Sequence, residues 1–479
     1  MSDEFQVSPT SPEEISTIVS ELNASFQTGR TQSVEWRKVQ LRNMWHMVDE
    51  NESSIREAIN KDIGKPMVQT QVLEIIIVKN DILNCLRNLD SWLEVETVDV
   101  PPPYENWSPT IHRRPKGTCL IIGSWNYPIV LNLLPFVGVI ASGNTGILKP
   151  SELSPHTATL IAALFPKYLD NTCFKVVNGG KSIAQTLLQF PYGHILYTGG
   201  AAVGREVMKS AAQHLTPVTL ELGGCNAALV TENANVELAA TRIAWAKFAA
   251  AGQTCFAPNH AIVHESVYDS FITALKHTYE SYYQQNATVE RVGRIVNNAH
   301  WKRIMDFFAS TNGKIILGGH GHEGSRFIEP TVIIDVDESD PVVQTEIFGP
   351  IFPVVKYSTT GDRNRLLQAL SSDALALYIF SDDLEQASSV MKSSITGSVA
   401  INDCMAQITP TGLPFGGFGK SGFGSYKGKA SIDTFSHKQS VVTVPTLPEF
   451  EELLGWRYPY AESMETVEFV KANLEEKMQ

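Results

Sequence analysis

Short apolar runs alternate with helix-period patterns from about residue 117 to 221. The apolar runs lie at Cys119–Gly123, Gly146–Lys149, Phe174–Asn178, His194–Thr198 and Val218–Leu222. Between them, apolar positions recur with the period of an α-helix at about 128–141, 153–168, 180–189 and 201–214. Strands and helices that alternate in this way predict a parallel sheet with helices on its faces.

A second alternating unit follows from 225 to 424. Its apolar runs predict strands near Ala227–Thr231, Ala261–His264, Lys314–Leu317, Val332–Ile334, Ile351–Val355, Ala376–Phe380 and Ser398–Asn402. Helical patterns such as Ser266–Tyr283 and Asn298–Ser310 lie between these runs. A chain of 479 residues is too long for one hydrophobic core. We therefore predict an α/β fold built from two sheet-based domains.

The flanking segments predict helices and a small arm. Residues 12–60 and 75–93 have helical patterns, the first opened by Ser11 and Pro12 with two acidic residues behind them. Two extended pieces and three prolines at 101–103 predict a projecting hairpin, since consecutive prolines suit an exposed edge. The run Ser440–Val444 predicts another strand, and Glu465–Lys477 a last helix. The predicted units are 1–97 with 115–224, 225–424, an arm of 98–114 with 432–445, and a tail of 446–479.

Composition and charge narrow the possible partners. The net charge of −13 disfavours nucleic acid or an anionic membrane as the main partner. The six cysteines show no C-x-x-C spacing and no clustering, which favours a reducing compartment. The acidic N-terminus lacks a signal-peptide core. The most apolar stretch, 129–142, is shorter than the roughly 18 residues of a membrane span. We expect a cytoplasmic protein without a transmembrane anchor, and we single out no metal site.

The first candidate for chemistry is Cys255. The pattern predicts a helix from Val236 to Ala250, which Gly252 would end in a left-handed turn. Pro258 would prevent the helix from restarting. Cys255 would then lie in a short loop where its thiol can reach a ligand. From the loop alone, a catalytic nucleophile and a small buried hydrophobic residue are both open.

The other candidates follow predicted strands, at the edge where parallel sheets bind ligands. They are Asn126, Lys149, Glu152, Gly199 and Glu221. The turn from Gly199 to Gly204 opens a helix, which suits a pyrophosphate, although an ordinary tight turn has the same sequence. Lys149 and Glu152 would suit ribose hydroxyls or a solvated surface. If Glu221 faces Cys255 and is buried, its raised pKa would suit proton transfer.

Two G-x-G-x-x-G matches do not predict a dinucleotide site. The match at 319–324 does not precede a helix, and the match at 417–422 follows no clear strand. The fingerprint requires strand, turn and helix together.

Taken in order, several motifs resemble the aldehyde dehydrogenase superfamily. The run 248–255 (FAAAGQTC) resembles its cysteine signature and 220–224 (LELGG) its glutamate signature. Further motifs occur in the family's order, namely 123–128 (GSWNYP), 143–152 (GNTGILKPSE), 198–204 (TGGAAVG), 346–350 (EIFGP) and 413–417 (LPFGG). The stretches 421–428 and 435–437 look like the class 3 and fatty aldehyde dehydrogenase branch. The resemblance implies a Rossmann-like cofactor domain (1–97 and 115–224), a catalytic domain (225–424) and an oligomerisation arm.

The resemblance also implies roles for single residues. Cys255 would attack the aldehyde carbonyl, and the Asn126 amide and the Cys255 N–H would hold the oxyanion. Hydride transfer would leave a thioester, and Glu221 would activate the water that hydrolyses it. The cofactor-binding residues would be Lys149 and Glu152 at the adenosine ribose, Gly199 and Gly204 at the pyrophosphate, and Glu346 and Phe348 at the nicotinamide ribose and ring. Asn402 matches a recurring polar position near the pocket.

The expected cofactor is NAD, with NADP as a second acceptor. A carboxylate such as Glu152 accepts hydrogen bonds from a 2′-hydroxyl and repels a 2′-phosphate. The aromatic residues Trp125, Tyr127 and Phe256 favour a hydrophobic aldehyde, medium- to long-chain or aromatic. The branch suggests a homodimer. The charged tail from Tyr460 to Gln479 departs from branch members that end in a hydrophobic anchor.

The sequence shows a second departure from the family pattern, and it leaves three other functions open. Cys225 stands where the family often has a basic residue, and we expect it to be structural. A CoA-acylating enzyme would have no need of Glu221 as a base. A cysteine hydrolase would need a histidine paired with Cys255, and only His260 and His264 lie near it in sequence. A silent family member acting as a binding or structural protein would not need the intact set of chemical residues.

Overall fold

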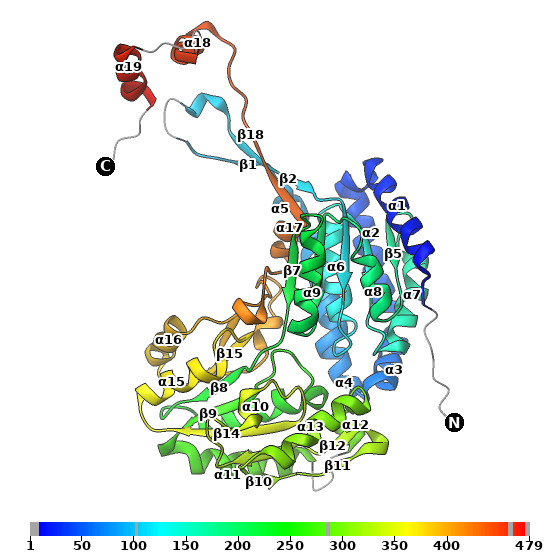
Figure 1. Ribbon diagram of the computed structural model, residues 1–479, viewed down its shortest axis with the longest axis vertical. Helices are drawn as coiled ribbons and strands as arrows, with labels where there is room; N and C mark the ends of the chain where they lie inside the picture. The colour runs from blue at the N-terminus through cyan, green and yellow to red at the C-terminus, as the bar shows by residue number, and fades with distance from the viewer. Residues whose placement is uncertain (1–8, 101–103, 284–287, 458–462, 475–479) are drawn as a thin grey trace.

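The computed structural model describes residues 9–100, 104–283, 288–457 and 463–474. Two α/β domains lie one above the other, and an arm projects from the upper one (Figure 1). This confirms the predicted α/β fold with two sheets. The predicted prolines at 101–103 and the last residues of the tail helix lie outside the described residues.

The first domain is a six-stranded sheet with the strand order β17-β7-β6-β3-β4-β5. Its strands are β3 (Thr118–Ile122), β4 (Thr145–Lys149), β5 (Phe174–Val176), β6 (His194–Thr198), β7 (Val218–Glu221) and β17 (Gly422–Phe423). Five strands are parallel, but β17 pairs antiparallel to β7. The prediction placed 422–423 in the second unit, and this part of the boundary is wrong. A strand of two residues carries too little pattern to be seen in the sequence.

Helices cover both faces of the first sheet (Figure 1). They are α1 (Pro12–Gln27), α2 (Val34–Glu50), α3 (Glu52–Ile63), α4 (Met67–Thr70), α5 (Ile76–Leu93), α6 (Val130–Ala141), α7 (Pro155–Tyr168), α8 (Lys181–Leu187), α9 (Ala201–Ala212) and α17 (Lys429–Phe435). The predicted start of α1 is confirmed, because the Ser11 hydroxyl accepts from the Glu14 N–H at 3.2 Å and the Glu14 carboxylate accepts from the Ser11 N–H at 2.7 Å. Every residue of α6 is buried, so this helix forms the centre of the domain.

The second domain is a seven-stranded sheet with the order β10-β13-β14-β9-β8-β15-β16. Its strands are β8 (Ala227–Val230), β9 (His260–His264), β10 (Lys314–Leu317), β13 (Thr331–Ile334), β14 (Ile351–Tyr357), β15 (Ala376–Phe380) and β16 (Ser398–Ile401). Its helices are α10 (Val236–Phe248), α11 (Glu265–Tyr283), α12 (Val289–Val292), α13 (Asn298–Ser310), α14 (Pro341–Gln344), α15 (Thr360–Ser371) and α16 (Leu384–Ser393). The edge strand β10 is antiparallel to β13, so the second sheet is mixed. The first rejected glycine motif, 319–324, contains β11 (Gly321–His322), which forms a small hairpin with β12 (Phe327–Ile328).

The arm is a three-stranded antiparallel sheet of β1 (Glu96–Thr97), β2 (Thr110–Pro115) and β18 (Ser436–Val441). The predicted hairpin is present, but its first strand begins at Glu96 and its third at Ser436. The observed strand therefore begins earlier than the predicted 440–444, because the first residues of β18 are polar and form no apolar run. The tail helices α18 (Pro448–Leu454) and α19 (Met464–Leu474) lie beyond the arm (Figure 1).

Candidate active site

Four strands of the first sheet end in register at one edge. Ile122 of β3 lies opposite Lys149 of β4 and Tyr197 of β6, and Thr198 of β6 lies opposite Glu221 of β7. The loops that follow these strands therefore emerge side by side. As the sequence predicts, the polar candidates of the first domain gather at its carboxyl edge.

A cavity of about 250 Å³ lies where this edge faces the second domain. It is lined by Ser124, Trp125, Asn126, Thr198, Gly199, Gly200, Glu221, Leu222, Gly223, Cys255, His300, Arg303, Glu346 and Phe348. The structure thus brings together Asn126, Gly199, Glu221, Cys255, Glu346 and Phe348. The other predicted residues, Lys149, Glu152 and Gly204, do not line this cavity.

The loop that carries Cys255 has an unusual backbone. Helix α10 ends at Phe248, before the predicted end at Ala250, and the chain then turns left-handed at Ala250 (φ 50), Ala251 (φ 54) and Gly252 (φ 71). A side chain at Gly252 would place its Cβ 2.2 Å from the Gly349 carbonyl oxygen. Glycine is therefore required here for space as well as for conformation. The turn delivers Cys255, half-buried, to the cavity.

The surroundings of the Cys255 thiol favour its neutral form. Burial raises its pKa, and the negative charges of Glu221 and Glu346 raise it further, against the backbone N–H groups of Phe256 and Cys255 that lower it. Since the thiolate is the nucleophile, a nearby base has to remove the proton.

Glu221 is a buried carboxyl group without a partner. Its side chain lies at the end of β7 with 2% exposure, and neither oxygen has a hydrogen-bond partner among the residues that the structure describes. Burial raises its pKa well above the usual 4.5. A buried carboxyl that faces a cavity without protein partners is suited to bind a water molecule there and to exchange a proton with it.

Asn126 connects the first domain to the cysteine loop. Its side-chain Nδ2 donates to the Gln253 carbonyl at 3.0 Å. The neighbouring Tyr127 hydroxyl lies 2.8 Å from the Thr254 hydroxyl. An amide has two N–H donors, so one remains after the bond to Gln253, and Asn126 lines the same cavity as Cys255.

Glu346 and Phe348 close the cavity from the second domain. The Glu346 carboxylate accepts from the Gly224 N–H at 3.1 Å, and burial raises its pKa to about 7. A Cβ at Gly223 would lie 2.2 Å from a Glu346 oxygen, so glycine is what allows this position. The Phe348 ring stands edge-on to Trp125 at 5.5 Å between centroids.

The residues beyond the cavity fit a dinucleotide. Helix α9 begins after Gly200 without a side-chain cap, and a Cβ there would meet nothing within 4 Å, so its N–H groups are open to a phosphate. The Lys149 ammonium donates to the Glu152 carboxylate at 3.3 Å. That carboxylate is half-exposed, so it can also accept from ribose hydroxyls. Gly204, predicted at the pyrophosphate turn, lies close to Leu222, because a Cβ on it would be 3.0 Å away. It packs α9 onto β7.

A second, apolar cavity of about 20 Å³ adjoins Cys255. It is lined by Leu73, Ile77, Tyr127, Val130, Leu131, Cys255, Phe256, Met405, Ile408, Phe415 and Tyr426. Cys255 thus stands between a polar cavity and an apolar one.

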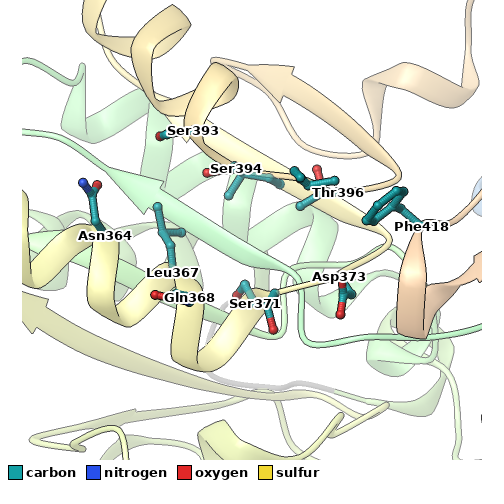
Figure 2. A pocket seen from close by; sticks show the side chains of 12 residues that line it. Asn364, Leu367, Gln368, Ser371, Asp373, Ser393, Ser394, Thr396 and Phe418 are labelled. Atoms are coloured by element: carbon teal, nitrogen blue, oxygen red, sulfur yellow. The ribbon is translucent and has the colours of Figure 1, made fainter.

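Another hollow, away from Cys255, carries no such chemistry. A cavity of about 410 Å³ lies between α15 and the segment after α16, and hydroxyls and amides line much of it (Figure 2). Its only titratable lining residue among those described is Asp373. The two histidines near Cys255 in sequence also lie elsewhere, since His260 bonds to Ser371 at 3.3 Å and His264 to Ser266 at 2.8 Å. Neither of these two residues can therefore serve as the histidine base of the hydrolase alternative.

Comparison with known proteins identifies the family. Residues 5–441 match the aldehyde dehydrogenase family. The chain belongs to that family. It is 39% identical to mouse "Aldehyde dehydrogenase family 3 member B1", covering 92% of this chain and 93% of the relative. It is 39% identical to the rat "Aldehyde dehydrogenase, dimeric NADP-preferring", covering 93% and 97%.

Solved structures agree with this assignment. The substrate-bound state of AldH from Staphylococcus aureus superposes with a TM-score of 0.87 at 36% identity, covering 92% of this chain and 99% of that one. The predicted superfamily and its class 3 branch are confirmed, and the protein is an aldehyde dehydrogenase by family. The name of the rat relative agrees with the predicted NAD or NADP cofactor class.

Several residues of this aldehyde dehydrogenase site escaped the sequence analysis. His300 and Arg303 line the polar cavity from one face of α13, a spacing of three residues that offered a signal only after the helix was placed. Asn402 does not line either Cys255 cavity, contrary to the expectation of a place near the pocket. Its amide instead bonds the Ser381 backbone at 2.8 and 2.9 Å and joins β16 to β15.

In the parts of the chain that the structure describes, no three His, Cys, Asp or Glu side chains group in a way that could hold a metal ion. No helix within those same parts has both the length and the apolar character that crossing a membrane requires.

Proposed function

We propose that this aldehyde dehydrogenase oxidises a hydrophobic aldehyde to its carboxylic acid with NAD or NADP, through a covalent intermediate on Cys255. The observation that carries the proposal is the meeting of three groups at one cavity. These are the thiol of Cys255, the unpartnered carboxyl of Glu221 and the amide of Asn126. A nucleophile, a base and an oxyanion donor are the groups that acyl transfer through a thiol requires.

The first half of the reaction forms a bond to sulfur. Glu221 takes the thiol proton, either directly or through one water, and the Cys255 sulfur attacks the aldehyde carbon. The free N–H of Asn126 and the backbone N–H of Cys255 then hold the oxyanion. One donor of this kind contributes roughly 3–4 kcal/mol to a transition state. NAD or NADP, when bound, supplies the acceptor for the hydride that leaves the substrate carbon, and a thioester remains on Cys255.

The second half of the reaction releases the acid. Glu221, in its ionised form, accepts a proton from a water molecule that attacks the thioester carbonyl. The C–S bond breaks, the thiolate of Cys255 returns, and the carboxylic acid leaves. Because burial raises the Glu221 pKa, this base is stronger than an exposed carboxylate. The same oxyanion donors serve both halves.

The proposed cofactor contacts follow from the positions of the site residues. Lys149 and Glu152 would hold the adenosine ribose, the N–H groups of α9 the pyrophosphate, and Glu346 and Phe348 the nicotinamide half. The Glu152 carboxylate favours NAD, and the name of the rat relative supports NADP as a second acceptor.

The proposed substrate class rests on the apolar cavity. Aliphatic and aromatic side chains line it, so an apolar tail is favoured over a charged one. At about 20 Å³ it has room for about one water molecule, so a long chain has to displace flexible lining side chains such as Met405. A rate that is flat across a series from acetaldehyde to hexadecanal would contradict this preference.

We also propose a cytoplasmic homodimer assembled through the arm. The arm sheet projects from the body of the protein, and a relative carries "dimeric" in its name (Figure 1). All six cysteines are free, which suits a reducing compartment. Light scattering of the purified chain should give the mass of two copies. Cell fractionation should place the protein with cytosolic markers, and recovery with membranes would refute this location.

The test of the proposed function is NAD(P)H formation. Wild type, Cys255→Ala and Cys225→Ala are mixed with NAD or NADP and an aldehyde panel that includes benzaldehyde, and absorbance at the NADH band is followed. Wild type and Cys225→Ala should each form one molecule of acid for every molecule of reduced cofactor. Cys255→Ala should form neither product. Reduced cofactor that appears only on addition of CoA would establish the CoA-acylating alternative.

A further inference from the structure

A fully buried ion pair lies behind the loop that carries Asn126. Lys65, in the connection between α3 and α4, and Glu74, in the π-helical segment Gln71–Ile75, are both 0% exposed. Their ammonium and carboxylate are in direct contact. A buried ion pair is seldom a strong source of stability, because removing two charges from water costs about as much as their attraction returns. Its presence therefore calls for another explanation.

Each donor direction of the Lys65 ammonium has an acceptor. An ammonium has three N–H groups. One points to Glu74, one to the Asn126 backbone carbonyl at 3.0 Å, and the ammonium lies 3.6 Å from the centroid of the Tyr127 ring. Two of these three partners are consecutive residues of the active-site loop.

Glu74 holds the other end of the same loop. The Glu74 oxygen that does not contact Lys65 accepts from the Ile129 N–H at 2.7 Å and from the Val130 N–H at 3.4 Å. These are the first N–H groups of α6, where a carboxylate satisfies unpaired donors and complements the helix dipole. The Lys65–Glu74 pair therefore holds both Asn126 and Ile129.

The fixed loop in turn positions the reacting groups. The Asn126 amide donates to Gln253 at 3.0 Å, and the Tyr127 hydroxyl contacts Thr254 at 2.8 Å, directly before Cys255. A chain of contacts thus runs from Lys65 through Asn126 and Tyr127 to the cysteine loop. Neither charged side chain lines the polar cavity, so the pair acts through other residues.

We propose that Lys65 and Glu74 are positioning residues that set the Asn126 amide at the oxyanion of the aldehyde dehydrogenase reaction. This inference rests on the proposed function, because it assigns the pair to the oxyanion step of that reaction. Burial lowers the pKa of Lys65 and raises that of Glu74, while their mutual attraction opposes both shifts. The ammonium of Lys65 donates to a carbonyl and contacts the face of a ring at the same time. No apolar side chain can do both, which accounts for a buried ion pair at this place.

The test variant is Lys65→Met with Glu74→Gln. Removing both charges leaves no unpaired ion, and the glutamine oxygen can still accept from the Ile129 N–H. The matched control is Arg37→Met, which removes another buried cation that donates to backbone carbonyls, those of Thr31, Gln32 and Ala141. Urea unfolding of each variant shows that it is folded at the assay temperature.

Three readouts separate positioning from a general structural role. The first is the burst of NADH with aldehyde, and the second is the burst of nitrophenolate from 4-nitrophenyl acetate, which acylates a thiol without a cofactor. The third is alkylation by iodoacetamide, which forms no oxyanion. For the pair variant we expect both bursts to slow by roughly 10²-fold, as for a small misplacement of a reacting group. Alkylation should be unchanged, and Arg37→Met should leave all three unchanged.

A mutant cycle with Asn126→Ala decides the route. If the pair acts through the Asn126 amide, replacing Lys65 and Glu74 in the Asn126→Ala background should slow the bursts no further. A full further loss in that background, or normal bursts in the pair variant, would overturn the inference while wild type still forms NADH. A wild-type protein that forms no NADH with any cofactor would refute the proposed function, and the inference with it.

Discussion

The left-handed turn before Cys255 makes a sharp prediction for Gly252→Ala. The added Cβ would lie 2.2 Å from the Gly349 carbonyl oxygen and 2.4 Å from its carbon, whereas real Cβ atoms essentially never come within 3.0 Å of a neighbour. The two backbones therefore have to separate by about 0.8 Å, the gap between the first distance and that limit. No flexible side chain can absorb this displacement, because both partners are main chain.

The expected magnitude has two parts. Overpacking of a tight interior costs about 1–3 kcal/mol, and a left-handed conformation costs a residue with a Cβ about 1–2 kcal/mol. Together they predict a loss of about 2–5 kcal/mol in the free energy of unfolding, which a domain of ordinary stability survives. Since Cys255 lies three residues on, a displacement near 1 Å should lower kcat/KM by roughly 10²-fold.

The assay compares three variants by urea unfolding and by NADH formation. Gly412→Ala is the packing control, because a Cβ there would meet nothing within 4 Å. Ala251→Gly is the loop control, because it changes the same turn without adding an atom, and relief of strain roughly offsets the added backbone entropy. Both controls should resemble wild type. If Gly252→Ala also resembles wild type in stability and rate, the placement of Cys255 by this close contact is wrong.

Three further predictions concern the carboxylates. Burial raises the pKa of Glu221, so the wild-type fold loses stability as pH rises from the unfolded value near 4.5 through the folded one. Glu221→Gln removes this loss. Its advantage in unfolding free energy over wild type should therefore grow with pH, and a pH-independent difference in urea titrations would contradict the burial argument. Glu152→Gln removes a charge that repels a 2′-phosphate. It should raise kcat/KM with NADP relative to NAD, and an unchanged ratio would show that the carboxylate does not face the ribose. Gly223→Ala would place a Cβ 2.2 Å from a Glu346 oxygen and displace that carboxylate. It should raise KM for NAD without changing iodoacetamide alkylation of Cys255, and a normal KM would separate Glu346 from the nicotinamide ribose.

Much of the fold was predictable because its signals are local. Buried parallel strands are apolar throughout, so strands such as β3 and β6 appear as short apolar runs between helices. Strand β17 was missed because two residues carry no distinct pattern, whereas β10 was predicted at its observed bounds and only its antiparallel direction was not. The end of α10 was misplaced because two alanines adopt left-handed conformations, which sequence assigns to glycine.

The site was predictable where a residue stands at a strand end or in a known motif. Asn126, Glu221 and Cys255 are of this kind. The Lys65–Glu74 pair was not found, because its meaning depends on a contact with Asn126 across 61 residues of chain. One signal was present in the sequence, a glutamate within the apolar run from Val72 to Val78. A carboxylate on such a buried helix face requires a partner, and only the structure identifies it.

The most direct test of the account is the mass of the enzyme during turnover. Glu221→Gln lacks the base that takes the thiol proton and activates water, so over a long incubation it should form the thioester slowly and hydrolyse it more slowly still. Intact mass spectrometry after mixing with NAD and a fatty aldehyde should show the added acyl group, and peptide mapping should place it on Cys255. Cys255→Ala should show no addition. An unmodified Glu221→Gln enzyme that still forms NADH, or an acyl group on another cysteine such as Cys225, would contradict covalent catalysis at Cys255.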